Sequence, residues 1–194
     1  CIHLYNMIFG DIFSNFLCQE QFNIDCKSMI KEILKYKKNN KTVAKSNYGG
    51  WQSDSFLEVK KPFNELFNLI DKCVNETQQK VQYEKKIKLN NYWFNVNSYG
   101  SFNRPHSHTG HFLSGVFYLS APKNSGNIVF INPVGAGLDF TFPNVNIFNQ
   151  YNSGTYHSYP KNKLCLLFSS HLYHYVETNM NKKERISISF NYGF

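Results

Sequence analysis

The chain has 194 residues, 42% of them hydrophobic and 18% charged, which is the composition of one globular domain and not of a disordered or fibrous protein. Its five cysteines form no CxxC pair and are odd in number, so we expect no disulfide framework and a reducing compartment, the cytoplasm. No apolar stretch approaches the roughly 20 residues of a membrane span, and the net charge of +8 lies mainly in short lysine runs typical of solvated helix faces and turns, which permit a nucleic-acid partner without indicating one.

Helical periodicity dominates the first 86 residues. Residues 25–41 place four apolar side chains on one stripe with lysines opposite, and residues 61–86 repeat this pattern with phenylalanine, leucine, isoleucine and valine. The loop between them, residues 46–56, is rich in glycine and contains Trp51. We therefore expect residues 1–86 to form a helical N-terminal layer.

The second half of the chain, residues 87–194, changes to the two-residue period of β-strands. Glycine, proline and asparagine separate the short alternating segments, which indicates a sandwich or barrel. These segments are residues 87–100, 111–122, 126–133, 154–160, 163–176 and 184–194. We predict a single α+β domain, mainly β, over residues 1–194. Its core would be a double-stranded β-helix, a barrel of the jelly-roll or cupin kind, with the N-terminal helices packed on one sheet.

A cluster of histidines in NRPHSHTGHF is the first candidate site. His106 and His108 stand two positions apart, so on an extended segment both imidazoles point to one face and can chelate one ion. The segment SSHLYHYV offers His174 or His171 as a third ligand, and imidazole suits iron, zinc, copper or nickel. The alternative is a set of hydrogen-bonded or surface histidines. His111 opens an apolar strand, so we expect it to have a structural or supporting role.

An arginine follows the candidate third ligand by eleven residues. On a strand, Arg185 and Ser187 face the same way, and a guanidinium with a neighbouring hydroxyl makes a carboxylate clamp if that face lines the barrel. The alternative is an arginine at the mouth of a strand that pairs with a surface carboxylate such as Glu184.

Together these segments resemble the 2-oxoglutarate and Fe(II)-dependent oxygenase superfamily, which carries an HxD or HxE motif, a distal histidine and an arginine about ten residues later. The matching residues are His106 in PHSH, His174 in SSHLYHYV, and Arg185 with Ser187 in RISISF. The wider pattern from SNYGGWQS to ERISISFN, residues 46–194, is similar to an uncharacterised branch found in bacteria and their viruses.

The resemblance implies an oxidoreductase, a dioxygenase that binds Fe(II) through His106, His108 and His174. It also implies 2-oxoglutarate and O2 as co-substrates, with release of succinate and CO2 as an unidentified primary substrate is hydroxylated. The distal carboxylate of 2-oxoglutarate would pair with Arg185, with hydrogen bonds from Ser187 and Tyr118. The candidate walls of the substrate pocket are Trp51 and Asn95.

One departure from the family pattern leaves alternatives open. His108 stands where the family has its acidic ligand, so the metal would have either three histidines or two histidines with water or another anion; Asp139 and Glu177 are substitute carboxylates. A three-histidine set also resembles the cupin dioxygenases, which need no 2-oxoglutarate, and residues 100–108 satisfy the opening of the first cupin motif. The third alternative is a non-enzymatic jelly-roll binding module.

Overall fold

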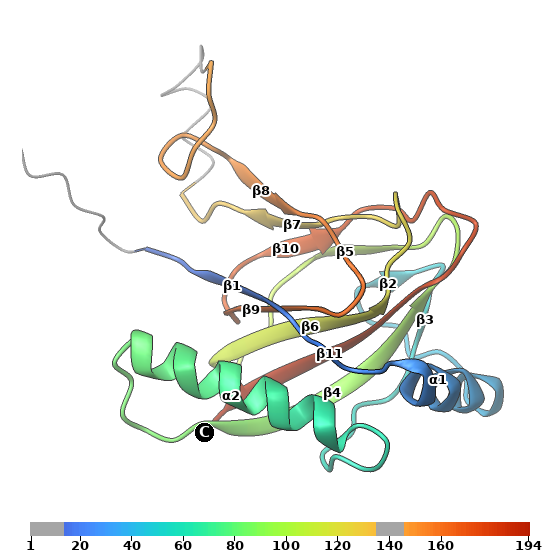
Figure 1. Ribbon diagram of the computed structural model, residues 1–194. Coiled ribbons are helices and arrows are strands. Elements are labelled where there is room, and N and C mark those ends of the chain that lie inside the picture. Colours follow the sequence, from blue (N-terminus) through green and yellow to red (C-terminus); the bar gives the residue numbers. More distant parts are fainter. Residues whose placement is uncertain (1–13, 135–145) are drawn as a thin grey trace, which may run out of the picture.

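The computed structural model of the chain describes residues 14–134 and 146–194, which form two antiparallel β-sheets and two helices (Figure 1). The first sheet has six strands, in the spatial order β1 (Leu17–Gln21), β9 (Leu164–Ser169), β6 (Leu113–Ser120), β11 (Arg185–Gly193), β4 (Lys88–Asn97) and β3 (Trp51–Gln52). The second has five strands, in the order β2 (Asn47–Tyr48), β5 (Phe102–His106), β10 (His174–Val176), β7 (Ile128–Ile131) and β8 (Thr155–Ser158). The protein is therefore mainly β.

Both helices cover one face of the six-stranded sheet (Figure 1). Helix α1 (Lys27–Asn39) buries Met29 and Ile33, and α2 (Asn64–Lys80) buries a longer apolar stripe. Phe67 of α2 packs against Tyr92 of β4, with ring centroids 4.7 Å apart. The apolar stripes read from the sequence are thus the faces that the helices bury. Among the described residues, neither helix has the length and hydrophobicity that crossing a bilayer requires.

The first 86 residues are not only a helical layer, because they also supply three strands. Strands β1 and β3 form the two edges of the six-stranded sheet, and β2 forms one edge of the five-stranded sheet. β2 and β3 have two residues each, which is too short for any period to be detected in a sequence. The N-terminal half therefore contributes strands to both sheets.

The segment 163–176, expected as one strand, is two strands in different sheets. Strand β9 belongs to the six-stranded sheet, and a turn closed by the hydrogen bond from Leu172 N to Ser169 O (3.0 Å) leads into β10 of the five-stranded sheet. Ser169 and Ser170 mark this turn in the sequence, but no glycine or proline accompanies them, so the segment was expected as one strand. The crossing places His174 opposite His106 as partners in the pairing of β10 with β5.

Strands β4 and β11 have two chemically different faces. The side chains that pack against the helices are apolar: Tyr92, Phe94 and Val96 of β4, and Ile186, Ile188, Phe190 and Tyr192 of β11. The alternate positions are mostly polar and face the five-stranded sheet, and their register pairs Asn97 with Arg185, Asn95 with Ser187, Trp93 with Ser189, and Asn91 with Asn191. A second apolar cluster, from β6, β7 and β9, joins the two sheets. The space between the sheets is thus part apolar core and part polar surface.

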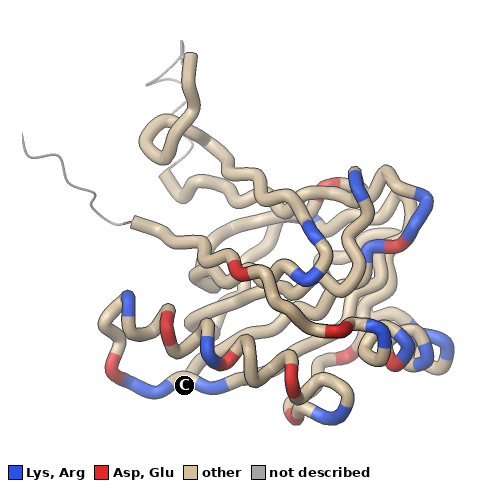
Figure 2. The backbone as a smooth tube through the Cα atoms, in the orientation of Figure 1, with Lys and Arg blue, Asp and Glu red and all other residues tan. Residues whose placement is uncertain are grey.

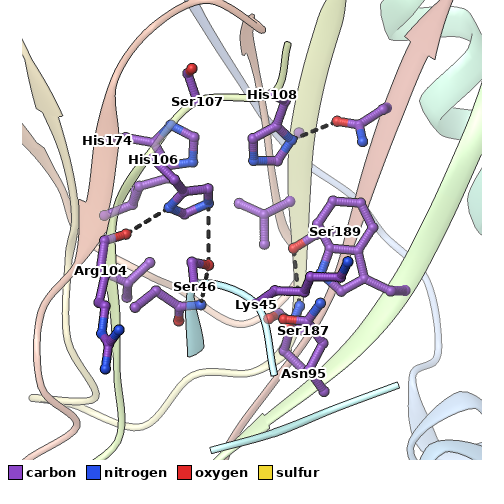
Figure 3. A pocket seen from close by; sticks show the side chains of 18 of the residues that line it. Lys45, Ser46, Asn95, Arg104, His106, Ser107, His108, His174, Ser187 and Ser189 are labelled. Atoms are coloured by element: carbon purple, nitrogen blue, oxygen red, sulfur yellow. Dashed lines mark hydrogen bonds between the residues drawn. The ribbon is translucent and has the colours of Figure 1, made fainter. Parts of the chain in front are cut away.

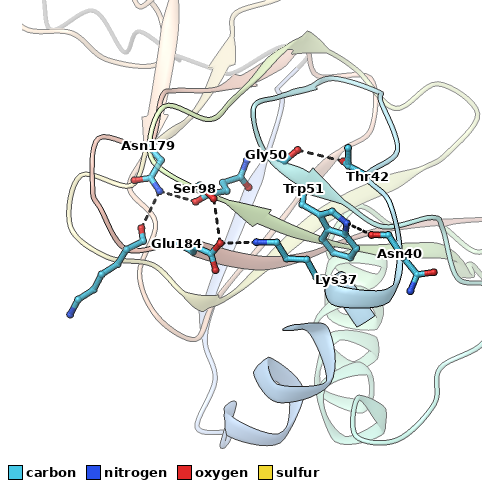
Figure 4. A network of polar contacts seen from close by, with 10 residues as sticks. Lys37, Asn40, Thr42, Gly50, Trp51, Ser98, Asn179 and Glu184 are labelled. Carbon is cyan, nitrogen blue, oxygen red and sulfur yellow. Dashed lines mark hydrogen bonds and ion pairs between the residues drawn. The ribbon is translucent and has the colours of Figure 1, made fainter. Parts of the chain in front are cut away.

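Charged residues lie mainly on the helices and the connecting turns, and the strands are nearly free of them (Figure 2). Near the end of β4 and the start of β11, the buried Asn179 links the strand to a loop: its Nδ2 donates to Asn97 O of β4 (2.8 Å) and to Lys183 O before β11 (3.1 Å). Beside it, Lys37 of α1 forms an ion pair with Glu184 (2.7 Å; Figure 4). Because that pair is partly exposed, it contributes at most about 1 kcal/mol. The buried amide of Asn179 is what fixes the start of β11.

Candidate metal centre

A cavity of about 730 Å³ opens between the two sheets, and its polar lining contains a cluster of three histidines (Figure 3). His106 ends β5, His108 follows it after one residue, and His174 begins β10. Each offers one ring nitrogen to a group in which all three atoms lie within 4.8 Å of one another. The close approach follows from the strand pairing, because His106 and His174 are directly opposite each other. Three such nitrogens could hold one metal ion.

The hydrogen bonds of the three rings determine which nitrogen of each carries the proton. The Nδ1 atom of His106 lies 2.7 Å from Arg104 O, that of His174 lies 2.9 Å from Leu172 O, and that of His108 lies 2.7 Å from Asn191 Oδ1. Carbonyl oxygens only accept hydrogen bonds, so each Nδ1 carries the proton and each Nε2 keeps its lone pair. This is the tautomer that an Nε2 ligand needs, and the donor set therefore fits a divalent transition metal.

The side-chain oxygen of Asn191 accepts the hydrogen bond from His108 Nδ1, as main-chain carbonyl oxygens do for His106 and His174. Its Oδ1 also accepts from Ser114 Oγ (2.7 Å), and its Nδ2 donates to Asn91 Oδ1 (2.9 Å). The side chain is buried, with 4% of its surface exposed. These contacts fix the amide with its oxygen toward His108 and so fix the tautomer of that ring.

We predict that Asn191→Leu weakens metal binding by about 10- to 100-fold, the usual effect of losing such a supporting hydrogen bond. The leucine removes the acceptor of His108 Nδ1, so the ring can rotate or change tautomer. Competition against a chromophoric chelator measures the affinity. Asn95→Leu is the matched control, because Asn95 lines the same cavity but bonds to Ser189 and not to a histidine. Equal affinity in the two variants would contradict the role of Asn191.

Burial lowers the pKa of all three imidazoles below the usual value for histidine, so the rings remain neutral at mildly acid pH. It lowers the pKa of His174 to about 3 and that of His108 to about 4, where the hydrogen bond with Asn191 partly opposes the effect. It also lowers the pKa of His106, against a hydrogen bond with Arg104 O. Metal ligands must be unprotonated. The folded protein therefore presents ligand-ready histidines at neutral and mildly acid pH.

The same burial predicts that the metal-free protein loses stability as the pH falls from about 6.5 to about 4. The unfolded chain takes up protons near pH 6.5, whereas His108 and His174 in the folded protein do not, so protons favour unfolding in this window. Between pH 7 and pH 5 each of these two histidines should lower the free energy of unfolding by about 2 kcal/mol. Urea denaturation in a chelator measures this loss, and His108→Leu should reduce it. An unchanged loss in that variant would contradict the assignment.

Arg185 is a buried cation without a carboxylate partner among residues 14–134 and 146–194. Only 2% of it is exposed, and its Nη1 donates to Ser125 O (2.6 Å) and Gly126 O (2.9 Å). Glu184, its neighbour in the chain, pairs with Lys37 instead. Burial lowers the pKa of Arg185, but a guanidinium stays charged in proteins. An unpaired buried charge is costly, and Arg185 lines the same cavity as the histidines, so the site is suited to an anion there.

Two further side chains named from the sequence lie beside Arg185. Ser187 and Tyr118 are cross-strand partners on β11 and β6, and both line the cavity. Burial raises the pKa of Tyr118 to about 12, against the nearby charge of Arg185, so its hydroxyl stays protonated and can donate. A guanidinium and two hydroxyls thus face one end of the cavity.

The remaining sequence expectations divide between the cavity and other surroundings. Asn95 lines the cavity, but Trp51 is not among its lining residues. The Trp51 ring packs on Tyr36 of α1, and its Nε1 donates to Asn40 O (3.0 Å; Figure 4). The loop position of Trp51 gave no information on which side of the sheet it covers. The tryptophan that lines the cavity is Trp93, which alternation along β4 places on the face of Asn95.

The substitute ligands that lie in the described part of the chain do not join the cluster. The exposed His171 bonds to Asn15 Oδ1 (3.0 Å), and Glu177 pairs with His157 (3.3 Å). Asp139 lies outside the described residues. His111 lines the cavity without entering the cluster, and its Nδ1 lies 3.1 Å from Asn90 Nδ2. The three histidines that the sequence suggested as ligands, His106, His108 and His174, are the ones that lie together in the structure.

Comparison with known proteins identifies a family and a fold. A family model described as "Putative 2OG-Fe(II) oxygenase" matches residues 91–191. A search of the curated proteins found no match.

A prolyl-4-hydroxylase from Pseudomonas putida is similar in structure, with a TM-score of 0.65, 13% identity and coverage of 93% of this chain and 94% of that one. The viral collagen prolyl hydroxylase of Paramecium bursaria Chlorella virus-1, solved with 2-oxoglutarate (2OG), has a TM-score of 0.58 and 13% identity, with coverage of 91% and 94%. HygX from Streptomyces hygroscopicus, solved with nickel and 2-oxoglutarate, has a TM-score of 0.59 and 11% identity, with coverage of 91% and 82%. At these identities the likeness shows the fold.

Proposed function

Because the chain belongs to the 2-oxoglutarate and Fe(II)-dependent oxygenase family, whose model spans just over half of it, we propose that it hydroxylates a substrate while 2-oxoglutarate is converted to succinate and CO2. The observation that carries the proposal is the pairing of two features in one cavity. Three imidazoles converge with their Nε2 lone pairs, and a buried guanidinium has no carboxylate partner among the described residues.

In this proposal His106, His108 and His174 hold Fe(II). When bound, the iron and 2-oxoglutarate together supply the activation of O2 that the amino-acid side chains cannot provide. The three main-chain and amide oxygens at Nδ1 keep the ligands oriented. Three protein ligands would leave room at an iron ion for the 2-oxo acid and for O2.

The role of Arg185 in the proposal is to bind the distal carboxylate of 2-oxoglutarate, with hydrogen bonds from Ser187 and Tyr118. A charge-assisted contact with a desolvated guanidinium is among the stronger polar interactions in proteins. The cavity also has an apolar part that suits the methylene chain between the two carboxylates; it is lined by Val116, Ile128, Phe168 and Val176. The same side chains limit the access of water to the buried arginine.

For the fold we propose that the two sheets are the halves of a double-stranded β-helix and that residues 1–194 are one domain. The support is that β11, β6 and β9 of one sheet and β5, β10 and β7 of the other line a common cavity. The helices lie on the far side of the six-stranded sheet from that cavity (Figure 1).

Turnover of labelled 2-oxoglutarate tests the function before any substrate is known. The protein with Fe(II), ascorbate and O2 should release succinate and CO2 slowly, and it should release neither without O2. Oxygen uptake with a thiol and no need for 2-oxoglutarate would support the three-histidine cupin class instead. Absence of succinate together with absence of 2-oxoglutarate binding in the presence of Mn(II) would overturn the proposal.

A further inference from the structure

The cavity has a one-sided charge distribution. Of the 13 acidic residues in the chain, none is among the described residues that line it. Besides Arg185, two cations line its rim, Lys45 before β2 and Arg104 on β5, and both are exposed. No carboxylate oxygen of residues 14–134 and 146–194 forms an ion pair with either of them. Arg104 lies over the ring of Tyr48 (5.8 Å), a contact that leaves its N–H groups available.

Lys45 and Arg104 are held on the same rim by the backbone. Arg104 N donates to Ser46 O (2.8 Å), which ties the residue after Lys45 to β5. Figure 3 shows Lys45 and Ser46 together over the cavity that contains His106 and His108. Lys45 therefore stands over the cavity, Arg104 stands at its outer edge with its guanidinium over Tyr48, and Arg185 stands at the buried end (Figure 3). A ligand that enters meets positive charge before it meets the metal site.

The floor of the cavity, on β4 and β11, offers both donors and acceptors that no hydrogen bond among residues 14–134 and 146–194 uses. Asn95 Nδ2 donates to Ser189 Oγ (3.0 Å), so the Asn95 Oδ1 acceptor and the Ser189 hydroxyl proton remain available. Asn91 Oδ1 accepts from Asn191, so Asn91 Nδ2 remains a free donor. Trp93 lies on the same face, between Asn91 and Asn95. Hydroxyl groups, which both donate and accept, match such a floor, and an aromatic ring suits the C–H face of a sugar.

We propose that the primary substrate is a small polyhydroxylated anion, a sugar or similar polyol that carries a phosphate or carboxylate. The inference rests on the proposed function, because it assigns Arg185 to 2-oxoglutarate and leaves Lys45 and Arg104 for the substrate. The anionic group lies at the rim with Lys45 and Arg104, and the hydroxyl groups bond to Asn91, Asn95 and Ser189. A cationic substrate finds no counter-charge in this cavity, and the histidine ligands, being neutral, do not offset the charge of the metal.

A matched series of four hexoses tests the charge preference. D-glucose, glucose 6-phosphate, glucuronate and glucosamine share one ring and differ in charge. Calorimetric titration into the protein loaded with Mn(II) and 2-oxoglutarate should give at least about tenfold tighter binding of the two anions than of glucose, since hydrogen bonds to charged groups are stronger than neutral ones. Glucosamine should bind more weakly than glucose. Comparison of phosphate with carboxylate shows which anionic group the rim prefers.

Variants locate the effect at the rim. Lys45→Gln and Arg104→Gln should each reduce the preference for the anions over glucose while 2-oxoglutarate binding stays unchanged. Lys80→Gln is the matched control, because Lys80 is an exposed lysine at the end of α2, which packs on the opposite face of the sheet. Equal affinity for all four sugars, preference for glucosamine, or no binding of any of them by protein that binds 2-oxoglutarate would overturn the inference. Failure to bind 2-oxoglutarate itself would overturn the proposed function instead.

Discussion

Arg185→Leu is expected to weaken 2-oxoglutarate binding at least about 30-fold and to abolish detectable succinate release. Loss of one partner from a buried charge pair costs about 2–5 kcal/mol, and in this protein no other cation among the described residues lines the buried end of the cavity. The leucine also removes the donors to Ser125 O and Gly126 O. Calorimetric titration of 2-oxoglutarate in the presence of Mn(II) measures the binding, and thermal unfolding of the same sample shows whether the variant is folded.

A second ligand separates loss of the carboxylate contact from general damage to the site. 2-Oxopentanoate has the same chain and the same 2-oxo acid group but lacks the distal carboxylate. The wild-type protein should prefer 2-oxoglutarate strongly, and the leucine variant should bind both ligands with similar affinity. If the variant kept the wild-type preference, the distal carboxylate would have another partner. Ser187→Ala should cause a smaller loss, because it removes a neutral hydroxyl and no charge.

Substitution of His108 should separate the three-histidine site from a two-histidine site. We expect His108→Leu to lower metal affinity by more than the 10- to 100-fold loss predicted for Asn191→Leu, because a ligand itself is lost. His108→Asp should retain much of the affinity, since it supplies a carboxylate ligand at the same position. Metal content after dialysis and competition with a chelator are the measurements. Both measurements can be made without turnover, so they do not require a known substrate.

The metal affinity of the His108 variants can also contradict the three-histidine site. If His108→Leu binds metal as tightly as the wild type, His106 and His174 hold the ion with water or another anion. If His108→Asp and His108→Leu lose affinity equally, the side chain at this position acts through its shape and not as a ligand. His171→Leu is the control for histidine loss in general, because His171 is exposed and lies outside the cluster.

Alternation along strands made much of the site predictable from the sequence. The spacing of His106 to His108 and of Arg185 to Ser187 is two residues, so any extended backbone puts each pair on one face. The same rule extended along β4 and β11 would have found Asn91, Trp93, Ser189 and Asn191, which line the cavity at the next positions of the same stripes. The rule fails for Trp51, because it lies on a two-residue strand beside a glycine-rich loop and has no stripe to follow.

What the sequence could not supply is the pairing between distant segments. The contact of His108 with Asn191 spans 83 positions and depends on how β11 lies beside β6 and β4. The turn after β9, which moves the chain from one sheet to the other, contains Ser169 and Ser170 but no glycine or proline, and it determines that His174 and not His171 joins the histidine cluster. Helix α2 ends at Lys80, before residues 81–86, which had been expected to belong to it.

The two-faced pair β4 and β11 also shapes how this protein can diverge. Neighbouring positions of β11 have different surroundings: Ile186, Ile188 and Phe190 lie in the apolar core, while Arg185, Ser187 and Ser189 line the cavity. Substitutions in the first set would destabilise the fold, whereas substitutions in the second would leave the protein folded and change the cavity. The rim residues Lys45 and Arg104 lie outside both sets and outside the core. If the proposed roles hold, related sequences can exchange substrates through changes at the rim while the metal centre is retained.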